Sequence, residues 1–255
     1  MSHIDETDES NDPARPTLSL VVPTLNECQN VVPLTDEAEA AMAGNTIEIL
    51  FADSASDDGT QEAVAAMAAS GRPVRLLALP RSASLSAACV AAAPEARSPV
   101  IAVCDADLQH DLSLLPRLLA ALEEGADFAV GSRYMAGGSS GSGLSPLRGL
   151  LSRGATVATR LSLGVRLTDP MSGFFALKRE RFLDALPKLS GRGFKILLDL
   201  ILADAKPPGI VELPYVMRPR AGGQSKLGLK ALSAAARQLG AGALRRQRRR
   251  LAGSR

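Results

Sequence analysis

Residues 100–110 have the sequence VIAVCDADLQH, in which an apolar run meets a cluster of polar side chains. The run Val100–Cys104 is short and rich in β-branched residues, which predicts a buried strand. Two carboxylates, Asp105 and Asp107, follow it directly. Ligands of open α/β sheets bind beyond the C-terminal ends of the strands. This stretch therefore predicts an α/β fold with a binding site at the end of this strand.

The sequence on either side of this strand continues the α/β pattern. Short apolar runs alternate with helical segments, and this alternation predicts a mostly parallel central sheet flanked by helices. The expected strands are 18–22, 47–51, 74–79, 100–104 and 128–130, and the expected helices are 31–42, 60–69, 85–93 and 114–122. After Arg133 we expect a flexible loop at 137–143, a helix at 147–163, a return to the sheet at 171–177, a helix at 194–203 and a strand at 210–213.

The composition restricts the class of protein. The 255 residues are enough for one α/β domain, and with 46% hydrophobic but only 3% aromatic residues its core must be aliphatic. No run of 18 apolar residues occurs and the N-terminus is acidic, so we expect neither a membrane span nor a targeting peptide. Three widely spaced cysteines predict reduced, buried thiols in the cytosol rather than disulfides or a zinc site.

Charge divides the chain into a disordered acidic arm at 1–16, an α/β domain at 17–226 and a basic amphipathic C-terminal segment at 227–255. Residues 213–255 contain eleven Lys and Arg and no acidic residue, whereas the rest of the chain has 18 basic and 27 acidic residues. A basic segment with an apolar helical face predicts attachment to an anionic membrane surface. A solvated tail and RNA binding are the alternatives, and no nucleic-acid motif supports the latter.

Two further strand ends carry polar clusters. Pro23-Thr-Leu-Asn-Glu27 closes the first strand, and Asp53-Ser-Ala-Ser-Asp-Asp58 follows the second. Such side chains can recognise a nucleobase or a ribose, although an Asx turn that caps the next helix would explain the second cluster equally well. In a parallel sheet these clusters and Asp105-Ala-Asp107 would all lie at one edge.

The cluster after the central strand has the chemistry of a metal site. Asp105, Asp107 and Gln109 offer hard oxygen ligands that suit Mg²⁺ or Mn²⁺ bound together with a substrate phosphate. The alternative for an isolated Asp-x-Asp pair is a solvated turn. His110 could be a ligand, but we expect an imidazole on the surface.

Six motifs occur in an order that resembles family 2 glycosyltransferases, most closely the dolichol-phosphate mannose synthase branch. They are VVPTLNE, ADSASDDGT, DADLQH, GSRY, DPMSGF and RAGGQSK, and they extend from about residue 18 to residue 226. The resemblance implies a GT-A type, Rossmann-like domain over residues 17–226. It also implies metal-dependent, inverting transfer of a hexose from a nucleotide-sugar, with GDP-mannose favoured, to a polyprenyl or dolichyl phosphate.

The resemblance also assigns roles to individual residues. The pattern departs from the family at Leu25, at Ser54 and in the turn 81–85, so the identity of the nucleobase stays open. The assigned residues are Pro23, Asn26, Glu27, Asp53 and Asp105 for the nucleotide-sugar, Asp105, Asp107 and Gln109 for the metal, Asp107, Arg133 and Asp169 for catalysis, and Arg148, Ser152, Arg220 and Lys226 for the acceptor phosphate.

The chemistry of a phosphate acceptor makes a dedicated base dispensable, because its second pKa of about 6 leaves it largely anionic near neutrality. Asp169 is the candidate if a carboxylate base exists, and a structural Asp-Pro turn is the alternative. A UDP-sugar donor, a non-catalytic nucleotide-sugar-binding scaffold and a nucleic-acid-binding module are the rival functions, and the acidic clusters disfavour the last. We expect a cytoplasmic protein, peripheral on the cytoplasmic face of the membrane, and we leave a membrane-anchoring partner open.

Overall fold

The computed structural model describes residues 15–139, 167–189, 191, 196–204 and 206–219. Within these ranges the strands form a seven-stranded sheet in the order β3-β2-β1-β4-β6-β5-β7. The strands are β1 (Leu18–Thr24), β2 (Ile47–Asp53), β3 (Val74–Ala78), β4 (Val100–Val103), β5 (Phe128–Ser132), β6 (Phe175–Lys178) and β7 (Ile210–Pro214). The predicted strands are therefore present, with ends that differ by a few residues.

The sheet is mostly parallel, as the sequence predicts. β6 is the exception, because it lies between β4 and β5 and pairs antiparallel with both. β5 consequently runs in the same direction as β4, and β7 pairs parallel with β5. The insertion of β6 therefore leaves the C-terminal ends of β1, β2, β4 and β5 at the same edge of the sheet.

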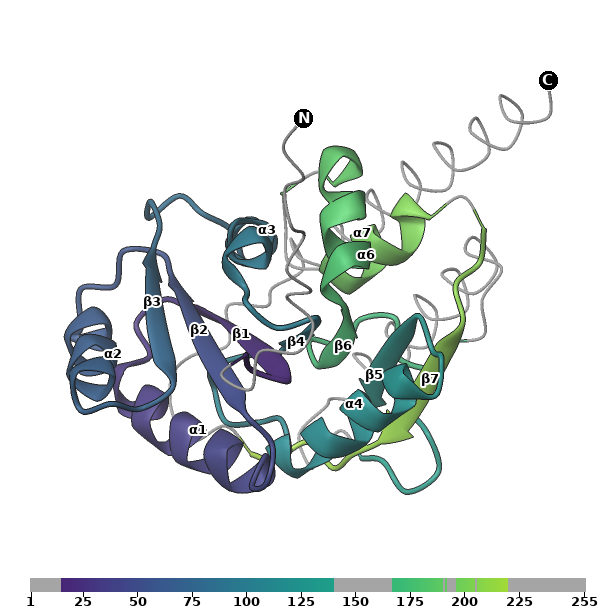
Figure 1. The fold of residues 1–255 in the computed structure, drawn as a ribbon, viewed down its shortest axis with the longest axis horizontal. Coiled ribbons are helices and arrows are strands. Elements are labelled where there is room, and N and C mark those ends of the chain that lie inside the picture. The colour runs from purple at the N-terminus through teal and green to yellow at the C-terminus, as the bar shows by residue number, and fades with distance from the viewer. Residues whose placement is uncertain (1–14, 140–166, 190, 192–195, 205, 220–255) are drawn as a thin grey trace, which may run out of the picture.

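Helices cover both faces of this sheet (Figure 1). One face packs against α1, α2 and α4, and the other packs against α3, α6 and α7. The helices are α1 (Cys28–Ala41), α2 (Thr60–Ala69), α3 (Leu85–Glu95), α4 (Leu115–Glu123), α6 (Arg179–Ala185) and α7 (Ile196–Ala203), with short 3-10 turns at Leu112–Leu114 and Leu186–Lys188. The sequence pattern did not predict α6, and α1 begins three residues before its predicted start.

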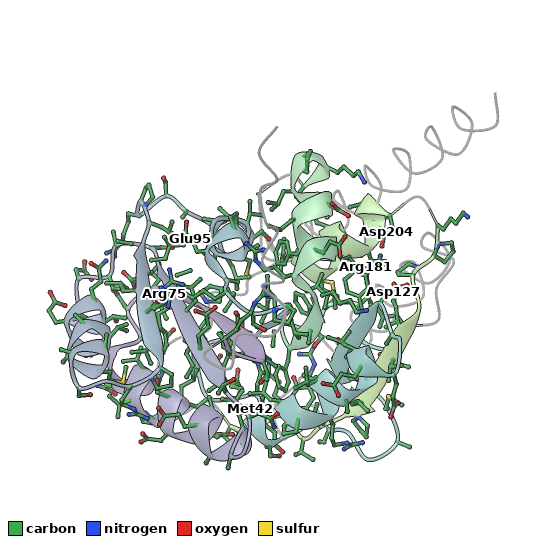
Figure 2. All side chains as sticks on the ribbon, in the orientation of Figure 1. Met42, Arg75, Glu95, Asp127, Arg181 and Asp204 are labelled. Carbon is green, nitrogen blue, oxygen red and sulfur yellow. The ribbon has the colours of Figure 1, made fainter. Side chains whose placement is uncertain are left out.

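Continuous apolar strands explain why both faces are covered. In β1, Leu20 and Val22 face α1 and α4, whereas Val21 between them faces α3. Because successive side chains of a strand point to opposite faces, an uninterrupted apolar strand must be buried on both sides. The core is aliphatic and alanine-rich, as the composition predicts. Figure 2 shows Arg75 on β3 beside Glu95 at the end of α3, where the two form an ion pair at 3.6 Å.

Several sequence predictions fall outside the described residues. They are the arm 1–16, apart from residues 15 and 16, the helix 147–163 and the basic segment 227–255. In the part of the chain that the structure describes, no helix is both long and apolar enough to cross a bilayer. The thiols of Cys89 and Cys104 are free and buried, as predicted, but Cys28 is partly exposed.

Candidate active site

The strand ends that carry the predicted site meet at one edge of the sheet. β1 pairs parallel with β2, where Thr24 is opposite Asp53, and with β4, where Val21 is opposite Val103. These registers place the loops after the three strands side by side. The predicted residues at this edge are Pro23, Asn26 and Glu27 on and after β1, Asp53 at the end of β2, Asp105, Asp107 and Gln109 after β4, and Arg133 after β5.

Three residues in these loops have a backbone that non-glycine residues rarely adopt. Asn26, Ala55 and Leu108 have φ angles of 58°, 54° and 59°. Among the described residues, they are the non-glycine positions with positive φ, and one follows each of β1, β2 and β4. The left-handed region is unfavourable for side chains with a Cβ atom, and such strain concentrates at functional sites. The three loops are therefore held in conformations that their local sequence does not favour.

The carboxylate of Asp53 holds the loop after β2 in shape. It is fully buried and accepts hydrogen bonds from Oγ1 of Thr24 (3.0 Å), the backbone N–H of Ser56 (2.9 Å) and Nε2 of Gln61 (2.6 Å). Burial acts to raise the pKa of Asp53, but the hydrogen bonds from Ser56, Gln61 and Thr24 outweigh it and lower the pKa below its ordinary value. Asp53 is therefore ionised near neutral pH.

Hydrogen bonds also join the loop after β1 to the loop after β2. The backbone N–H of Asn26 donates to Oγ of Ser56 (2.8 Å), and Oδ1 of Asn26 accepts from the backbone N–H of Asp57 (3.2 Å). The backbone N–H of Glu27 donates to Oγ1 of Thr60 (3.0 Å). These bonds join the two loops that the sequence assigns to the nucleotide. Many of the polar groups in both loops therefore serve to hold the loops together.

The residues predicted to bind a metal lie on the loop after β4. Asp107 is nearly buried and accepts a hydrogen bond from the backbone N–H of Gln109 (3.2 Å), whereas the side chain of Asp105 is 37% exposed. Gly173 lies so close to Asp105 that a Cβ atom added at Gly173 would come within 2.9 Å of Oδ2 of Asp105. Two carboxylates and an amide oxygen fit Mg²⁺ or Mn²⁺, which completes its shell with water and phosphate. No group of three His, Cys, Asp or Glu side chains in the described ranges forms a metal site.

His110 packs against this loop and supports it. Its ring stacks on Phe174 with centroids 5.2 Å apart and meets Tyr215 edge-on at 5.7 Å. Its Nδ1 accepts the backbone N–H of Asp105 (3.2 Å). The prediction of a surface imidazole is wrong, because His110 is only 3% exposed. Burial lowers the pKa of His110 to about 4, so the ring is neutral near pH 7 and its Nδ1 is occupied as an acceptor.

Arg133 and Asp169 form a buried bidentate ion pair. Nε and Nη2 of Arg133 donate to the two carboxylate oxygens of Asp169 at 2.6 and 2.8 Å. Burial acts to lower the pKa of Arg133, but Asp169 outweighs it and the pKa rises above its ordinary value. Asp169 is 0% exposed and both its oxygens accept from Arg133, so the pair fixes the orientation of the guanidinium.

A second layer of residues, which the sequence analysis did not single out, holds this ion pair. The carboxylate of Glu212 on β7 accepts from the backbone N–H and Oγ1 of Thr168 and from the backbone N–H of Asp169. Oγ of Ser172 donates to the backbone oxygen of Gly131 on β5 (2.7 Å). In the sequence, Ser172 is marked by its place in the DPMSGF motif, whereas Glu212 lies in none of the six motifs.

Arg218 ties the chain after β7 to the loop after β4. Its backbone N–H donates to the backbone oxygen of Gln109 (2.9 Å), and Nε2 of Gln109 donates to the backbone oxygen of Arg218 (3.1 Å). The guanidinium of Arg218 contacts Glu37 (2.7 Å) and Asp111 (3.0 Å). The four residues predicted to hold the acceptor phosphate, Arg148, Ser152, Arg220 and Lys226, lie outside the described residues.

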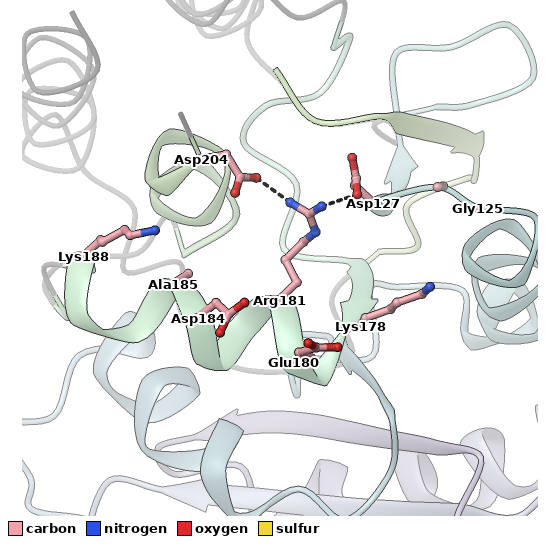
Figure 3. Close-up of a pocket in the computed structure, with 10 residues that line it drawn as sticks. Gly125, Asp127, Lys178, Glu180, Arg181, Asp184, Ala185, Lys188 and Asp204 are labelled. Carbon is pink, nitrogen blue, oxygen red and sulfur yellow. Dashed lines mark hydrogen bonds and ion pairs between the residues drawn. The ribbon is translucent and has the colours of Figure 1, made fainter. Parts of the chain in front are cut away.

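A separate cavity of about 420 Å³ lies at the opposite edge of the sheet, beside the start of β5 and the end of β6. Figure 3 shows Arg181 at its centre, where it bridges Asp127 and Asp204. Because two carboxylates already neutralise this cation, the cavity offers no free positive charge of Arg181 to a phosphate. It is remote from the strand ends that carry the predicted site.

Comparisons with known proteins agree with the motifs. Glycosyl transferase family 2 matches residues 19–184. The chain is 37% identical over 212 residues to the dolichol-phosphate mannosyltransferase of Pyrococcus furiosus, a match that covers 82% of this chain and 59% of that protein. It is 34% identical over 235 residues to the polyprenol monophosphomannose synthase of Mycolicibacterium smegmatis, which covers 87% of this chain and 86% of that protein.

Solved structures agree on the fold. Glucosyl-3-phosphoglycerate synthase from Mycobacterium tuberculosis, in complex with Mn²⁺, UDP and glucosyl-3-phosphoglycerate, superposes with a TM-score of 0.65 at 22% identity. The superposition covers 91% of this chain and 80% of that chain. At this level of identity the likeness concerns the fold alone, and it confirms the expected GT-A type α/β architecture.

Proposed function

Since the chain belongs to glycosyl transferase family 2, we propose that it transfers a hexose, with mannose favoured, from a nucleotide-sugar to a polyprenyl phosphate. The observation that carries the proposal is the meeting of Asp53, Asp105, Asp107 and Arg133 at one sheet edge. Carboxylates for a metal and a guanidinium for a phosphate are what the cleavage of a sugar–diphosphate bond requires. The names of the relatives supply the sugar and the lipid.

In this proposal Asp105, Asp107 and Gln109 hold Mg²⁺ or Mn²⁺, which would neutralise charge on the leaving diphosphate. The M. tuberculosis neighbour bound to Mn²⁺ supports a divalent metal, without deciding between the two ions. Arg133 would meet a phosphate, since Asp169 engages its Nε and Nη2, whereas Nη1 contacts, within the described part of the chain, the weakly accepting sulfur of Met217 at 3.8 Å. Asp169 then serves catalysis by orienting Arg133.

The acceptor needs orientation more than activation. A phosphate monoester is largely dianionic above its second pKa of about 6, so it attacks without losing a proton to the protein. Displacement from the face opposite the diphosphate would invert the anomeric carbon. We assign Arg148 and Ser152, four residues apart in the sequence, and Arg220 and Lys226 to the acceptor phosphate. The basic segment 227–255 would bring the domain to the anionic cytoplasmic face of the membrane, where a lipid-linked acceptor lies.

A UDP-sugar donor is the second candidate, and Ser54 is the observation that favours it. Ser54 stands where family members usually have a second Asp, and the residue is only 5% exposed. Its hydroxyl points to the backbone oxygen of Ala83 at 3.4 Å and so adds no contact for a guanine base. The M. tuberculosis structures with UDP belong to the same fold.

One donor panel tests both candidates. The full chain is assayed with GDP-mannose, UDP-glucose and other UDP-sugars against a short polyprenyl phosphate, with Mg²⁺, with Mn²⁺ and with EDTA. We expect the highest kcat/KM with GDP-mannose, loss of transfer with EDTA, and a product whose anomeric configuration is opposite to that of the donor by NMR. A higher kcat/KM with a UDP-sugar would establish the second candidate.

The variant Asp107→Asn tests the metal ligands, and Asp184→Asn is its control, because Asp184 is an exposed carboxylate beside the remote cavity. Asp107→Asn should lower kcat at least 100-fold, whereas Asp184→Asn should leave it unchanged. Transfer that continues in EDTA would disprove the metal requirement. Binding of nucleotide-sugar without any transfer would point to the non-catalytic scaffold.

A further inference from the structure

Tyr215 carries a buried hydroxyl group. The residue directly follows β7 and is 3% exposed. Its hydroxyl finds no hydrogen-bond partner among the described residues. A buried donor without a partner destabilises a protein, and each such group calls for an explanation.

The rest of Tyr215 is firmly held, so the hydroxyl cannot easily turn to another partner. Its backbone N–H donates to the backbone oxygen of Ser132, and its backbone oxygen accepts from Ser139, both at 3.1 Å. Its ring meets the rings of His110 and Phe174 edge-on, with centroids 5.7 and 5.8 Å apart. These contacts hold both the backbone and the ring of Tyr215, so its hydroxyl points in one direction.

Tyr215 lies beside the candidate site, because its ring meets His110 edge-on and Nδ1 of His110 accepts the backbone N–H of Asp105. Burial raises the pKa of Tyr215. The positive charge of Arg133 acts to lower this pKa but only partly offsets burial, and the negative charges of Asp169, Asp105 and Asp107 raise it further. The group therefore stays protonated and is a hydrogen-bond donor. The backbone bond of Tyr215 to Ser132, the residue before Arg133, places Tyr215 and Arg133 next to each other where β5 pairs with β7.

Arg133 has a weakly bonded donor of its own. Its Nε and Nη2 are spent on Asp169, whereas Nη1 contacts the thioether sulfur of Met217 at 3.8 Å, and sulfur is a weak acceptor. Tyr215 and Arg133, at the adjacent ends of β7 and β5, thus each offer a donor that has no strong acceptor in the described ranges. Such a pair is suited to an anionic oxygen.

We propose that Tyr215 is a substrate-binding residue whose hydroxyl, together with Nη1 of Arg133, donates to a phosphate oxygen. The inference rests on the proposed function, because the phosphate belongs to the diphosphate of the donor or to the phosphate of the acceptor. In both cases the bound phosphate would supply the acceptor that the hydroxyl lacks among the described residues.

Tyr215→Phe isolates the hydroxyl, because it keeps the ring and its contacts with His110 and Phe174. Ser86→Ala on α3 is the matched control, since Ser86 is 0% exposed and its hydroxyl also has no hydrogen-bond partner among the described residues. Without ligand, both variants should have an unchanged or higher Tm, because each removes an unsatisfied buried group. A clear drop in the Tm of Tyr215→Phe alone would show that its hydroxyl is already bonded, and would overturn the proposal.

The binding of phosphate anions is then measured separately from transfer. Pyrophosphate with Mn²⁺ should raise the Tm of the wild type and of Ser86→Ala, and Tyr215→Phe should need about tenfold more pyrophosphate for the same shift. This readout holds even if the chain transfers no sugar, so it separates failure of this inference from failure of the proposed function. Equal pyrophosphate titrations and equal transfer kinetics for Tyr215→Phe and wild type would overturn it.

Two further titrations identify the source of the phosphate. A loss of about tenfold in affinity for the nucleoside diphosphate, with the KM for the short polyprenyl phosphate unchanged, would place Tyr215 on the donor. The reverse pattern would place it on the acceptor. Either result supports the proposal.

Discussion

At the scale of single residues, Asp53 links the candidate site to stability. Its carboxylate is fully buried and accepts from Thr24, Ser56 and Gln61, and these bonds lower its pKa below the value of an unfolded chain. A carboxyl group with a lowered pKa stabilises the folded state above its unfolded pKa, and this contribution disappears as the pH falls through the folded pKa. The ionised form is therefore part of the fold.

We predict that Asp53→Asn destabilises the protein by about 2 kcal/mol or more at pH 7, because an amide would turn a donor toward groups that themselves donate. The variant should also lose less stability than the wild type when the pH falls below about 4. Urea unfolding at a series of pH values measures both effects. Parallel curves for wild type and variant at acidic pH would show that the ionisation of Asp53 is not coupled to folding.

The Arg133–Asp169 pair gives a second prediction at this scale. Asp169→Asn leaves a guanidinium that is 18% exposed without its counter-ion and should cost about 3 kcal/mol of stability. Transfer should fall because Arg133 loses its orientation, but the pH–rate profile of the remaining activity should keep the shape of the wild-type profile. If the acidic limb of the wild-type profile, which reports a group that must be deprotonated, disappeared in the variant, Asp169 would instead be identified as a general base.

At the scale of elements, Arg218 joins the end of β7 to the loop after β4. The segment that carries Arg220 and Lys226 begins two residues further on. Arg218 bridges Glu37 and Asp111, while Arg72 elsewhere bridges Asp36 and Glu39 in the same way. The two arginines therefore make comparable, partly exposed ion pairs, but only Arg218 touches the predicted metal loop.

We predict that Arg218→Ala and Arg72→Ala each cost less than about 1 kcal/mol of stability, because exposed ion pairs contribute little. Arg218→Ala should nevertheless lower transfer by roughly tenfold, since small displacements of substrate-orienting groups are costly. Thermal unfolding and transfer kinetics of both variants check this. Equal activity of the two variants would mean that Arg218 plays no part in positioning the site.

At the scale of the whole molecule, the distribution of charge predicts how the protein meets its lipid substrate. Five of the six residues 245–250 are arginine. Each basic residue near an anionic leaflet contributes about 1 kcal/mol, screened over a Debye length of about 8–10 Å. This cluster lies outside the region that carries the catalytic motifs.

Deletion of residues 244–255 should therefore weaken binding to anionic liposomes while transfer to a short, water-soluble acceptor continues at the wild-type rate. Added salt should mimic the deletion, and neutral liposomes should bind both proteins poorly. Co-sedimentation across a salt series, beside the soluble-acceptor assay, makes the comparison. Undiminished binding of the shortened chain, or loss of soluble-acceptor transfer, would contradict a tethering role.

The sequence alone determined the layers of the fold and the edge that carries the candidate site. Apolar runs such as Leu18–Val22 and Val100–Cys104 specify buried strands by local composition, and short connections through helices make them parallel. Parallel strands end at one edge, so Asp53, Asp105 and Asp107 had to gather there. Each of these conclusions needs only a local pattern and a general rule of chain direction.

Only the tertiary structure decided what the polar side chains do. The antiparallel insertion of β6 depends on pairing between distant segments, and α6 is too short to show a helical period. His110 is buried because Phe174 and Tyr215, far along the chain, cover it. Asp169 is engaged by Arg133, 36 residues away, and the hydroxyl of Tyr215 has no hydrogen-bond partner in the part of the chain that the structure describes. Burial and partnership are properties of contacts between distant residues, and no local pattern encodes them.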